Sequence, residues 1–411
     1  MRLTQYIFRV FICGLQLIIF IGGSSSTAIA SEELAVDQLV EGNNRFALQL
    51  YQKLRTPDGN LFFSPYSISS AIAMTYAGAR GETATQMAET FHFQLEQDAL
   101  HLAFANLATQ FQNVQESGNV VFKIANALWI QEDFDLLDAF LDVVKEYYQA
   151  GLFQVNFQEA YENVRADINA WVAEQTNQKI KDLLAPGTLS NLTRLVLTNA
   201  IYFKGDWAAQ FDKEETQEES FWLNPEKETK LLMMHRKDSF KYAEDERIQV
   251  LQLPYAGEEI SMVVLLPRTK DGLVEMETQL TFEDLIRWID QSSLREVEVF
   301  LPKFTLTSQF SLSDTLKAMG MCTAFSEQAD FSGMEASKSL SISDVIHKAF
   351  VEVNEEGTEV AAATAVIIGV TSVAEPQPIP VFRADHPFLF LIRDNQSGSI
   401  LFIGKIMNPA S

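Results

Sequence analysis

The chain has 411 residues, of which 47% are hydrophobic and 21% charged, and its formal net charge at pH 7 is −24. This composition is typical of a globular protein with a large core, and the negative charge excludes nucleic acid and anionic membranes as main partners. No Gly/Ser-rich or Pro-rich linker and no internal repeat divides the chain, which favours one domain over two or three.

The first 30 residues have the pattern of an export signal. Arg2 and Arg9 precede an apolar run, residues 10–22, and small residues lead to Ala30. A membrane anchor is the alternative, but the apolar run is short for one. We therefore expect cleavage after Ala30, a secreted or periplasmic protein without membrane association, and a mature domain of residues 31–411.

The hydrophobic periodicity predicts helices before and between strands. Apolar residues at three- and four-residue spacing predict helices over residues 36–54, 161–184, 282–289 and 313–319. Alternating or continuous apolar runs predict strands over residues 122–130, 195–203, 250–253, 260–266 and 296–299, and in the two runs "FLFLIR" and "ILFIGKI" near the C-terminus. Helices early and antiparallel strands late indicate an α+β fold.

The sequence contains none of the short motifs that accompany catalysis. There are five histidines and no HExxH, CxxC, Walker A, GxGxxG or GxSxG motif. Ser64 and Ser67, in "NLFFSPYSISSAIAM", have no base beside them in the sequence. We therefore expect no enzyme activity, no metal site and no cofactor.

One segment near the C-terminus, "EEGTEVAAATAVIIGVTSVAEPQPIP" (355–380), resembles a strand in composition but not in setting. It carries no charge from Val360 to Ala374 and is too short to span a membrane. A permanent core strand is the plain interpretation, although Gly357 loosens its entry and the alanines at 361–363 fill a core poorly. One face is small and mostly apolar, so the segment fits between strands or outside them, and the residues alone leave both open.

Five segments together resemble the serpin family and occur in the family's order. They are the hinge "EEGTEVAAATA" (355–365), "NLFFSPYSISSAIAM" (60–74), "LTNAIYFKGDW" (197–207), "HKAFVEVNEEG" (347–357) and "DHPFLFLIRDNQSGSILFIGKIMNP" (385–409). The resemblance spans roughly residues 36–410 and implies one α+β domain with three β-sheets, about nine helices and an exposed reactive loop at about 355–380. A monomer is the family default.

The function that this resemblance implies is suicide inhibition of a protease. The target attacks the loop as a substrate, an acyl-enzyme forms, and the cut loop inserts into the central sheet and distorts the attached protease. The alternative is a non-inhibitory carrier, chaperone or storage protein of the same fold, which tends to have bulky or charged hinge residues. Thr358 and the alanine run favour inhibition, whereas Val360, where the family usually has Ala, is expected to slow insertion.

The resemblance also assigns roles to individual residues. The reactive bond falls at Thr371–Ser372, and since no Lys or Arg lies between Thr358 and Ala374, the expected target is an elastase-like or subtilisin-like serine protease, with a cysteine protease as the alternative. If the reactive bond lies one residue earlier, Val370 occupies the primary specificity pocket of the protease and the expected target class is unchanged. The hinge consists of Glu356, Gly357, Thr358, Glu359, Val360, Ala361, Ala362 and Ala363. The residues expected where the sheet opens are Ser64, Ser67, Asn199, His347 and Trp207.

Overall fold

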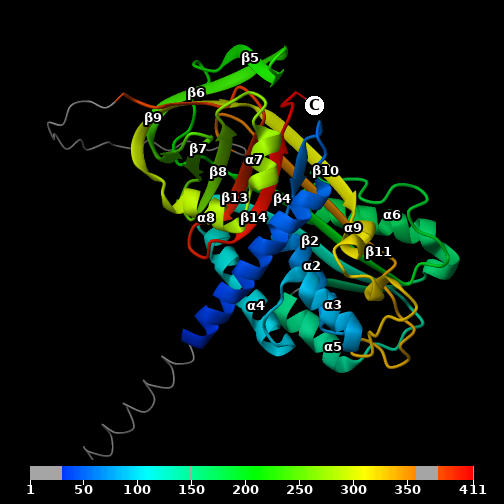
Figure 1. Ribbon diagram of the computed structural model, residues 1–411. Coiled ribbons are helices and arrows are strands. Elements are labelled where there is room, and N and C mark those ends of the chain that lie inside the picture. Colours follow the sequence, from blue (N-terminus) through cyan, green and yellow to red (C-terminus); the bar gives the residue numbers. More distant parts are fainter. Residues whose placement is uncertain (1–29, 149, 358–377, 411) are drawn as a thin grey trace, which may run out of the picture.

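The structure, a computed structural model, describes residues 30–148, 150–357 and 378–410 (Figure 1). All but the last residue of the expected export signal, and the reactive loop from residue 358 to residue 377, lie outside these ranges. The described residues contain nine α-helices. They are a helix at residues 30–54, α2 (Pro65–Tyr76), α3 (Gly81–Phe91), α4 (Gln97–Glu116), α5 (Asp138–Val143), α6 (Phe157–Gln175), α7 (Leu273–Gln279), α8 (Phe282–Asp290) and α9 (Ser313–Ala318).

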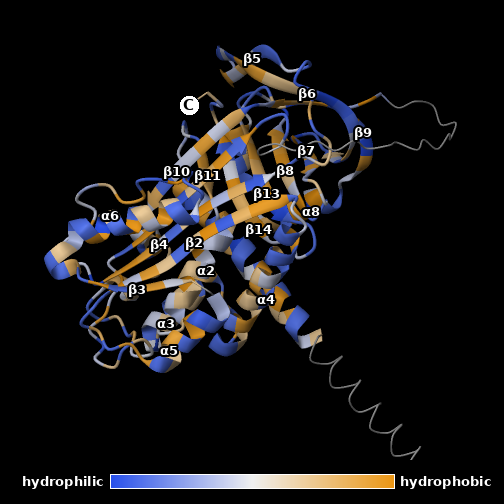
Figure 2. Cartoon of the chain, turned by 180° about the vertical axis from the view of Figure 1, so that it is seen from behind, coloured by the Kyte–Doolittle hydropathy of each residue, from blue (hydrophilic) through white to orange (hydrophobic). Residues whose placement is uncertain are grey.

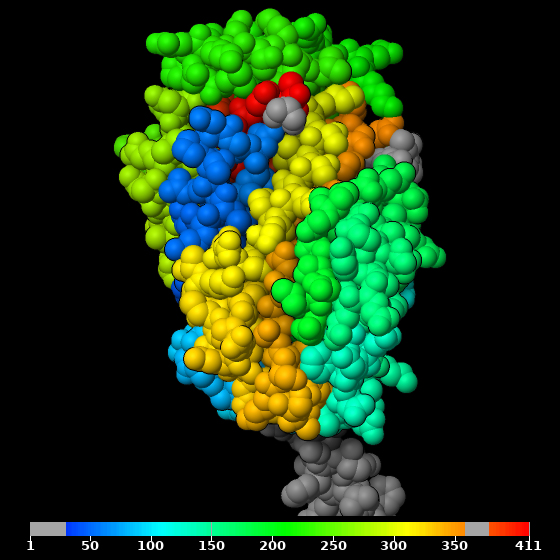
Figure 3. All heavy atoms as spheres, turned by 90° about the vertical axis from the view of Figure 1, so that its right-hand side faces the viewer, coloured from blue at the N-terminus to red at the C-terminus, as the bar shows by residue number. Residues whose placement is uncertain are grey.

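A five-stranded sheet occupies one half of the molecule. Its order is β10-β11-β4-β2-β3, with the bounds β2 (Val120–Gln131), β3 (Gly151–Val155), β4 (Leu195–Gly205), β10 (Phe304–Ser311) and β11 (Asp344–Val353). Figure 3 looks at one side of the molecule, where the narrow orange band that contains β11 lies between yellow and green segments.

A nine-stranded assembly occupies the other half, in the order β1-β14-β13-β8-β7-β6-β9-β12, with β5 paired to β6. The bounds are β1 (Leu61–Phe63), β5 (Gln217–Asn224), β6 (Lys227–Glu244), β7 (Ile248–Pro254), β8 (Ile260–Pro267), β9 (Ser293–Pro302), β12 (Val381–Arg383), β13 (Phe388–Asp394) and β14 (Ile400–Ile406). The long strand β6 pairs with β5 over residues 227–233, with β9 over residues 233–242, and with β7 over residues 241–244. The strands on the two sides of β6 form two parts of this assembly, which together with the five-stranded sheet is consistent with the three sheets predicted.

The hydrophobic core lies between the sheets and extends around α2. This helix is apolar nearly all round, begins at Pro65 behind the N-cap Ser64, and contacts both β4 and β14. Figure 2 shows the apolar strands at the centre and hydrophilic residues on the outer helices. Because eleven of its twelve residues are buried, the polar residues that α2 carries need hydrogen-bond partners inside the protein.

Two expectations from the sequence need correction. The helix expected over residues 161–184 ends at Gln175, because Asn177 and Gln178 adopt positive φ angles of 51° and 63°. The strands are not all antiparallel: β11 pairs parallel with β4, β2 with β3, and β12 with β9. The α+β class itself is confirmed, and the parallel pair β11–β4 is the one that matters for function.

Candidate functional site

The strand that leads into the reactive loop, β11, pairs directly with β4. The two strands are parallel from Asp344, opposite Val196, to Phe350, opposite Tyr202. Each has an antiparallel neighbour on its other side, β10 for β11 and β2 for β4. No strand therefore lies between β11 and β4 among the described residues, and the gap that an inserted strand would enter is closed.

A polar cluster lies under this closed gap. His347 on β11 stands opposite Asn199 on β4, and the two side chains are hydrogen-bonded through Nδ1 and Oδ1. The backbone N–H of Ser64 donates to His347 Nε2 at 3.1 Å, and the N–H of Ser67 donates to Ser64 Oγ at 3.1 Å. Asn199 Nδ2 donates to the carbonyl of Ser67 at 3.0 Å. The four residues predicted from the sequence to meet here therefore do so.

The protonation state of His347 follows from these contacts. A backbone N–H is always a donor, so Nε2 of His347 accepts from Ser64 and Nδ1 carries the proton that it donates to Asn199. Burial lowers the pKa of His347 to about 3, and the imidazole is neutral at physiological pH. The neutral, fully buried ring thus joins β11 both to the start of α2 and to Asn199 of β4, which also bonds to Ser67 directly.

Asn126 belongs to the same cluster, although it is not among the residues predicted from the sequence. It lies on β2, opposite Asn199, and its Oδ1 accepts from Asn199 Nδ2 and, at 3.5 Å, from Ser67 Oγ. The sequence does indicate that Asn126 is unusual, since it shares one face of the predicted strand with apolar residues only. A lone buried amide in such a face calls for a polar partner, but only the tertiary structure identifies that partner.

Trp207 closes the gap at its upper end, beside the start of the hinge. Its indole Nε1 donates to the carbonyl of Asn354 at 3.0 Å, and its backbone N–H donates to the carbonyl of Glu356 at 3.0 Å. The ring stacks on Tyr255 with centroids 4.6 Å apart. Trp207 therefore holds residues 354–356 in place by both its side chain and its backbone.

Gly357 is the last described residue of the hinge, and no other residue fits its place. Its φ is 122°, and a Cβ atom there would lie 2.4 Å from the carbonyl oxygen of Gly205 and 2.5 Å from the nitrogen of Trp207. Its N–H donates to the carbonyl of Asn354 at 3.2 Å, and that residue's N–H donates back to the carbonyl of Gly357 at 2.9 Å. The hinge thus begins in a tight turn packed against β4.

Two ion pairs hold the acids that precede the turn. Lys303 Nζ lies 2.8 Å from Glu355 Oε2, and Lys213 pairs with Glu356. Burial is the largest single effect on Glu355 and opposes its charged form. The hydrogen bonds from Lys303, the backbone and Thr216, together with the charge of Lys303, outweigh it, so the pKa of Glu355 is lowered. The two pairs tie the base of the hinge to the residue between β9 and β10 and to the segment after β4.

The remaining predicted site residues are outside the described ranges. They are Thr358, Glu359, Val360, Ala361, Ala362 and Ala363 of the hinge, and Thr371 and Ser372 of the reactive bond. Within the described ranges, no group of three or more His, Cys, Asp or Glu residues has the arrangement of a metal site, and no helix is both long and apolar enough to cross a bilayer.

Comparison with known proteins decides the family. The family model for "Serpin (serine protease inhibitor)" matches residues 41–409. This chain belongs to the serpin family. It is 42% identical to human Serpin B4 over 394 residues and 44% identical to the human leukocyte elastase inhibitor over 385 residues, and each alignment covers 91% of this chain and 100% of the relative.

Solved structures have the same fold. Uncleaved ovalbumin superposes with a TM-score of 0.82 at 32% sequence identity, covering 90% of this serpin and 100% of the ovalbumin chain. Serpin48 of the insect Tenebrio molitor superposes with a TM-score of 0.80 at 30% identity, covering 90% and 98% of the two chains. The predicted serpin fold is confirmed.

The relatives also bear on two broader predictions, of which they confirm one and contradict the other. They are protease inhibitors, so the prediction that this serpin is not an enzyme is confirmed. The prediction of a secreted or periplasmic protein is wrong, because Serpin B4 and the leukocyte elastase inhibitors are intracellular clade B serpins. That prediction rested on the composition of the first 30 residues, which lie outside the segment that the family model matches.

Proposed function

We propose that this serpin is a suicide-substrate inhibitor of a serine protease. The protease attacks the reactive loop at Thr371–Ser372 and forms an acyl-enzyme. The N-terminal part of the cut loop then enters the five-stranded sheet between β11 and β4 and carries the attached protease with it. The domain that performs these steps extends from residue 31 to residue 411, acts as a monomer, and has its loop at about 355–380.

The observation that carries this proposal is the direct, parallel pairing of β11 with β4. The chain leaves β11 at Val353 and turns at Gly357, so a strand that folds back beside β11 runs antiparallel to it. Because β4 is parallel to β11, the same strand also runs antiparallel to β4. Insertion therefore exchanges one parallel pair for two antiparallel pairs, which are slightly more stable per residue.

The free energy available for this rearrangement is large. Insertion adds about a dozen ladder hydrogen bonds, and at a net 0.5–1.5 kcal/mol each they contribute on the order of 10 kcal/mol. That value is comparable to the stability of an entire domain, about 5–15 kcal/mol. The uncut fold is then held by a kinetic barrier, and cleavage of the loop removes that barrier.

The loop composition favours a protease with a small, apolar primary pocket. The residue before the cut bond, Thr371, is small and uncharged, and no cation lies between Thr358 and Ala374. The human and bovine relatives named leukocyte elastase inhibitor, 44% and 45% identical, support the same target class. We therefore propose an elastase-like or subtilisin-like serine protease, with a cysteine protease as the alternative target.

A second function, a non-inhibitory carrier, is favoured by one observation. Human thyroxine-binding globulin, solved with its hormone, superposes with a TM-score of 0.82 at 31% identity. The small hinge residues Thr358 and Ala361–Ala363 argue against this function, because a carrier has no need of a strand that fits a narrow gap.

A single gel separates the two functions. The full-length protein is mixed with pancreatic elastase in equal amounts and run under denaturing conditions, in parallel with active-site-blocked elastase. Inhibition predicts a covalent band at the summed mass that is absent with the blocked enzyme. Complete cleavage after Thr371 without that band would contradict trapping and favour the carrier.

A further inference from the structure

The far end of the reactive loop is attached through a very short strand. The described chain resumes at Pro378, and β12 has three residues, which pair with β9 at the edge of the nine-stranded assembly. The N–H of Glu298 donates to the carbonyl of Pro380 at 3.0 Å, and the N–H of Ala384 donates to the carbonyl of Phe300 at 2.9 Å. A short edge strand with so few ladder bonds detaches at a low free-energy cost.

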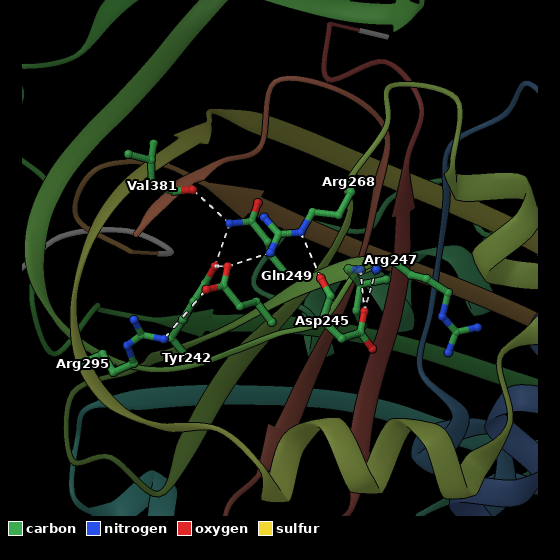
Figure 4. Close-up of polar contacts among 9 residues, drawn as sticks. Tyr242, Asp245, Arg247, Gln249, Arg268, Arg295 and Val381 are labelled. Atoms are coloured by element: carbon green, nitrogen blue, oxygen red, sulfur yellow. Dashed lines mark hydrogen bonds and ion pairs between the residues drawn. The ribbon is translucent and has the colours of Figure 1, made fainter. Parts of the chain in front are cut away.

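A buried side chain from another strand strengthens this attachment. Gln249 is on β7, which is separated from β12 by β6 and β9 in the strand order, yet its Nε2 donates to the carbonyl of Val381 at 2.9 Å. Figure 4 shows the Gln249 amide between this carbonyl and the hydroxyl of Tyr242. Gln249 is 8% exposed, so its bond to Val381 is shielded from competing water.

The second hydrogen of the amide is held as firmly as the first. Gln249 Nε2 donates to the hydroxyl oxygen of Tyr242 at 2.7 Å, and that hydroxyl donates to Glu244 Oε2 at 2.7 Å. Arg268 donates to the same carboxylate oxygen at 2.6 Å, and Arg295 Nη1 lies 3.9 Å from Oε1. The carboxylate thus fixes the direction of the Tyr242 hydroxyl, which in turn fixes the Gln249 amide.

Burial and the neighbouring carboxylate keep this arrangement in one protonation state. Burial first, and the bond to Glu244 second, raise the pKa of Tyr242 to about 12. The same bond lowers the pKa of Glu244. At neutral pH the phenol is therefore a donor and the carboxylate an acceptor, and the orientation of the amide does not change.

Chain length shows why the attachment matters in a serpin that inserts its loop. A strand laid along all of β11, which has 10 residues, is on the order of 33 Å long. Without a cut, the 12 or so residues that remain before Pro380 must return over the same length, and fully extended they reach only about 40 Å. The two ends of the loop are attached to neighbouring parts of the chain. Pro380 accepts from Glu298 in β9, and Glu355 pairs with Lys303, the residue that follows β9. Insertion of the uncut loop therefore requires these returning residues to be almost fully extended, and detachment of β12 removes that requirement by lengthening the return segment.

We propose that Gln249 is a positioning residue of the reactive loop, whose amide holds Val381 on the sheet and thereby prevents the uncut loop from inserting. This role rests on the proposed inhibitory function. It has the consequence that Gln249 sets how long the intact protein remains able to trap a protease.

The test compares two glutamines of the same strand. Gln249→Met removes the donor at nearly constant volume. The control, Gln252→Met, removes an equally buried amide on β7 that donates to the carbonyl of Ile289 at 3.0 Å, in α8 and away from the loop. Tyr242→Phe, which keeps the ring and removes the hydroxyl, is the second test variant in case Gln249→Met does not fold.

Each full-length protein is held at a fixed temperature without protease, and the fraction that still traps elastase is measured over time. We expect Gln249→Met to lose activity about 5–10-fold faster than the wild type, the factor that corresponds to one buried hydrogen bond, with its chain intact on a gel. Tyr242→Phe changes the rate in the same direction, and Gln252→Met keeps the wild-type rate. Equal rates for Gln249→Met and wild type, or equal acceleration by Gln252→Met, would overturn the proposal.

Amide hydrogen exchange makes the result independent of protease. The N–H of Glu298 donates to Pro380, just before β12, and the N–H of Ala384, just after β12, donates to Phe300. We expect both N–H groups to exchange faster in Gln249→Met than in Gln252→Met. If the wild type forms no covalent complex, the proposed function fails, and this comparison alone decides whether Gln249 holds the strand. Equal exchange in the two variants would contradict the role of Gln249 while leaving inhibition intact.

Discussion

Glu277 illustrates at the scale of one residue how the core is joined across distant segments. Its carboxylate accepts from the hydroxyl of Tyr51, lies 3.2 Å from Arg55 Nη1, and lies 3.5 Å from Lys405 Nζ. The Lys405 side chain is 0% exposed, and burial lowers its pKa although Glu277 opposes the shift. One carboxylate therefore connects the N-terminal helix, α7 and β14.

Removal of this carboxylate is expected to be costly. Glu277→Ala leaves Lys405 buried without its counter-charge, and we expect the free energy of unfolding to fall by about 3–5 kcal/mol. Urea unfolding measures the difference. Glu275→Ala, on the exposed face of the same helix, is the control and is expected within about 0.5 kcal/mol of wild type. A loss in Glu277→Ala no larger than in the control would contradict the importance of the cluster.

His347 makes stability depend on pH. Its pKa is about 3 in the folded protein and about 6.5 when unfolded, so the unfolded chain binds more protons between these values and stability falls as the pH is lowered through this window. Between pH 7 and pH 5 the loss from this residue is about 2 kcal/mol. His347→Gln should abolish that part of the pH dependence, as measured by urea unfolding at several pH values.

The buried His101 provides a comparison for this measurement. Burial lowers its pKa to about 4, so it contributes a loss of the same sign. His347→Gln should therefore reduce the pH dependence without removing it, and the double variant with His101→Gln should reduce it further. An unchanged slope in His347→Gln would show that the ring is not held neutral.

At the scale of elements, the gap between β11 and β4 is held closed by contacts beneath it and at its upper end. The polar cluster beneath the gap fastens both strands to α2, so separation of the strands breaks the bond between His347 and Asn199. At the upper end, Trp207 and the ion pairs of Glu355 and Glu356 hold the start of the hinge. These contacts hold the sheet closed in the intact protein, and the proposed insertion must break them.

A large charge in the hinge should stop insertion. Thr358 follows the turn at Gly357 and would be the first hinge side chain to enter the gap, where a guanidinium has no partner. With Thr358→Arg we expect the covalent complex with elastase to fall at least about tenfold, the factor for 1.4 kcal/mol, with cleaved serpin in its place. Quantitative gels measure the ratio of the two products.

Thr358→Ser is the matched control, because it keeps a small hydroxyl side chain at the same position. It should trap elastase as the wild type does. Trapping by Thr358→Arg at the wild-type level would show that the hinge begins elsewhere.

At the scale of the whole molecule, the proposed function makes the native state less stable than the cut and inserted state. In the described part of the molecule the parallel strands β11 and β4 are direct neighbours in the five-stranded sheet, and the proposed function inserts a further strand between them. If the protein works in this way, the intact form persists behind a kinetic barrier although the inserted form has a lower free energy.

Cleavage of the loop should therefore make the protein harder to unfold. With on the order of 10 kcal/mol gained on insertion, the Tm of a domain of this size should rise by about 10 °C or more. Calorimetry before and after limited cleavage measures the change, and Thr358→Arg, cleaved in the same way, should rise far less. An unchanged Tm in the cleaved wild type would rule out insertion.

Much of this serpin was predictable from local patterns, since these depend on neighbours in the chain. Helical and strand periodicities, the N-cap of α8 at Thr281 and the small residues of the hinge are all local features. The same locality explains the errors: the helix expected to reach residue 184 ends where Asn177 turns, and the location inferred from the first 30 residues is contradicted by the relatives of the domain.

Only the tertiary structure decided which distant residues meet. The direction of β11 relative to β4 has no local signature, because β11 alternates buried and partly exposed residues as an antiparallel strand does, yet pairs parallel with β4. Neither the partner of Asn126 nor the reach of Gln249 across a curled assembly to Val381 is visible in the sequence. These contacts exist because burial forces each polar group to find a partner, and the fold, not the chain order, determines which partner is near.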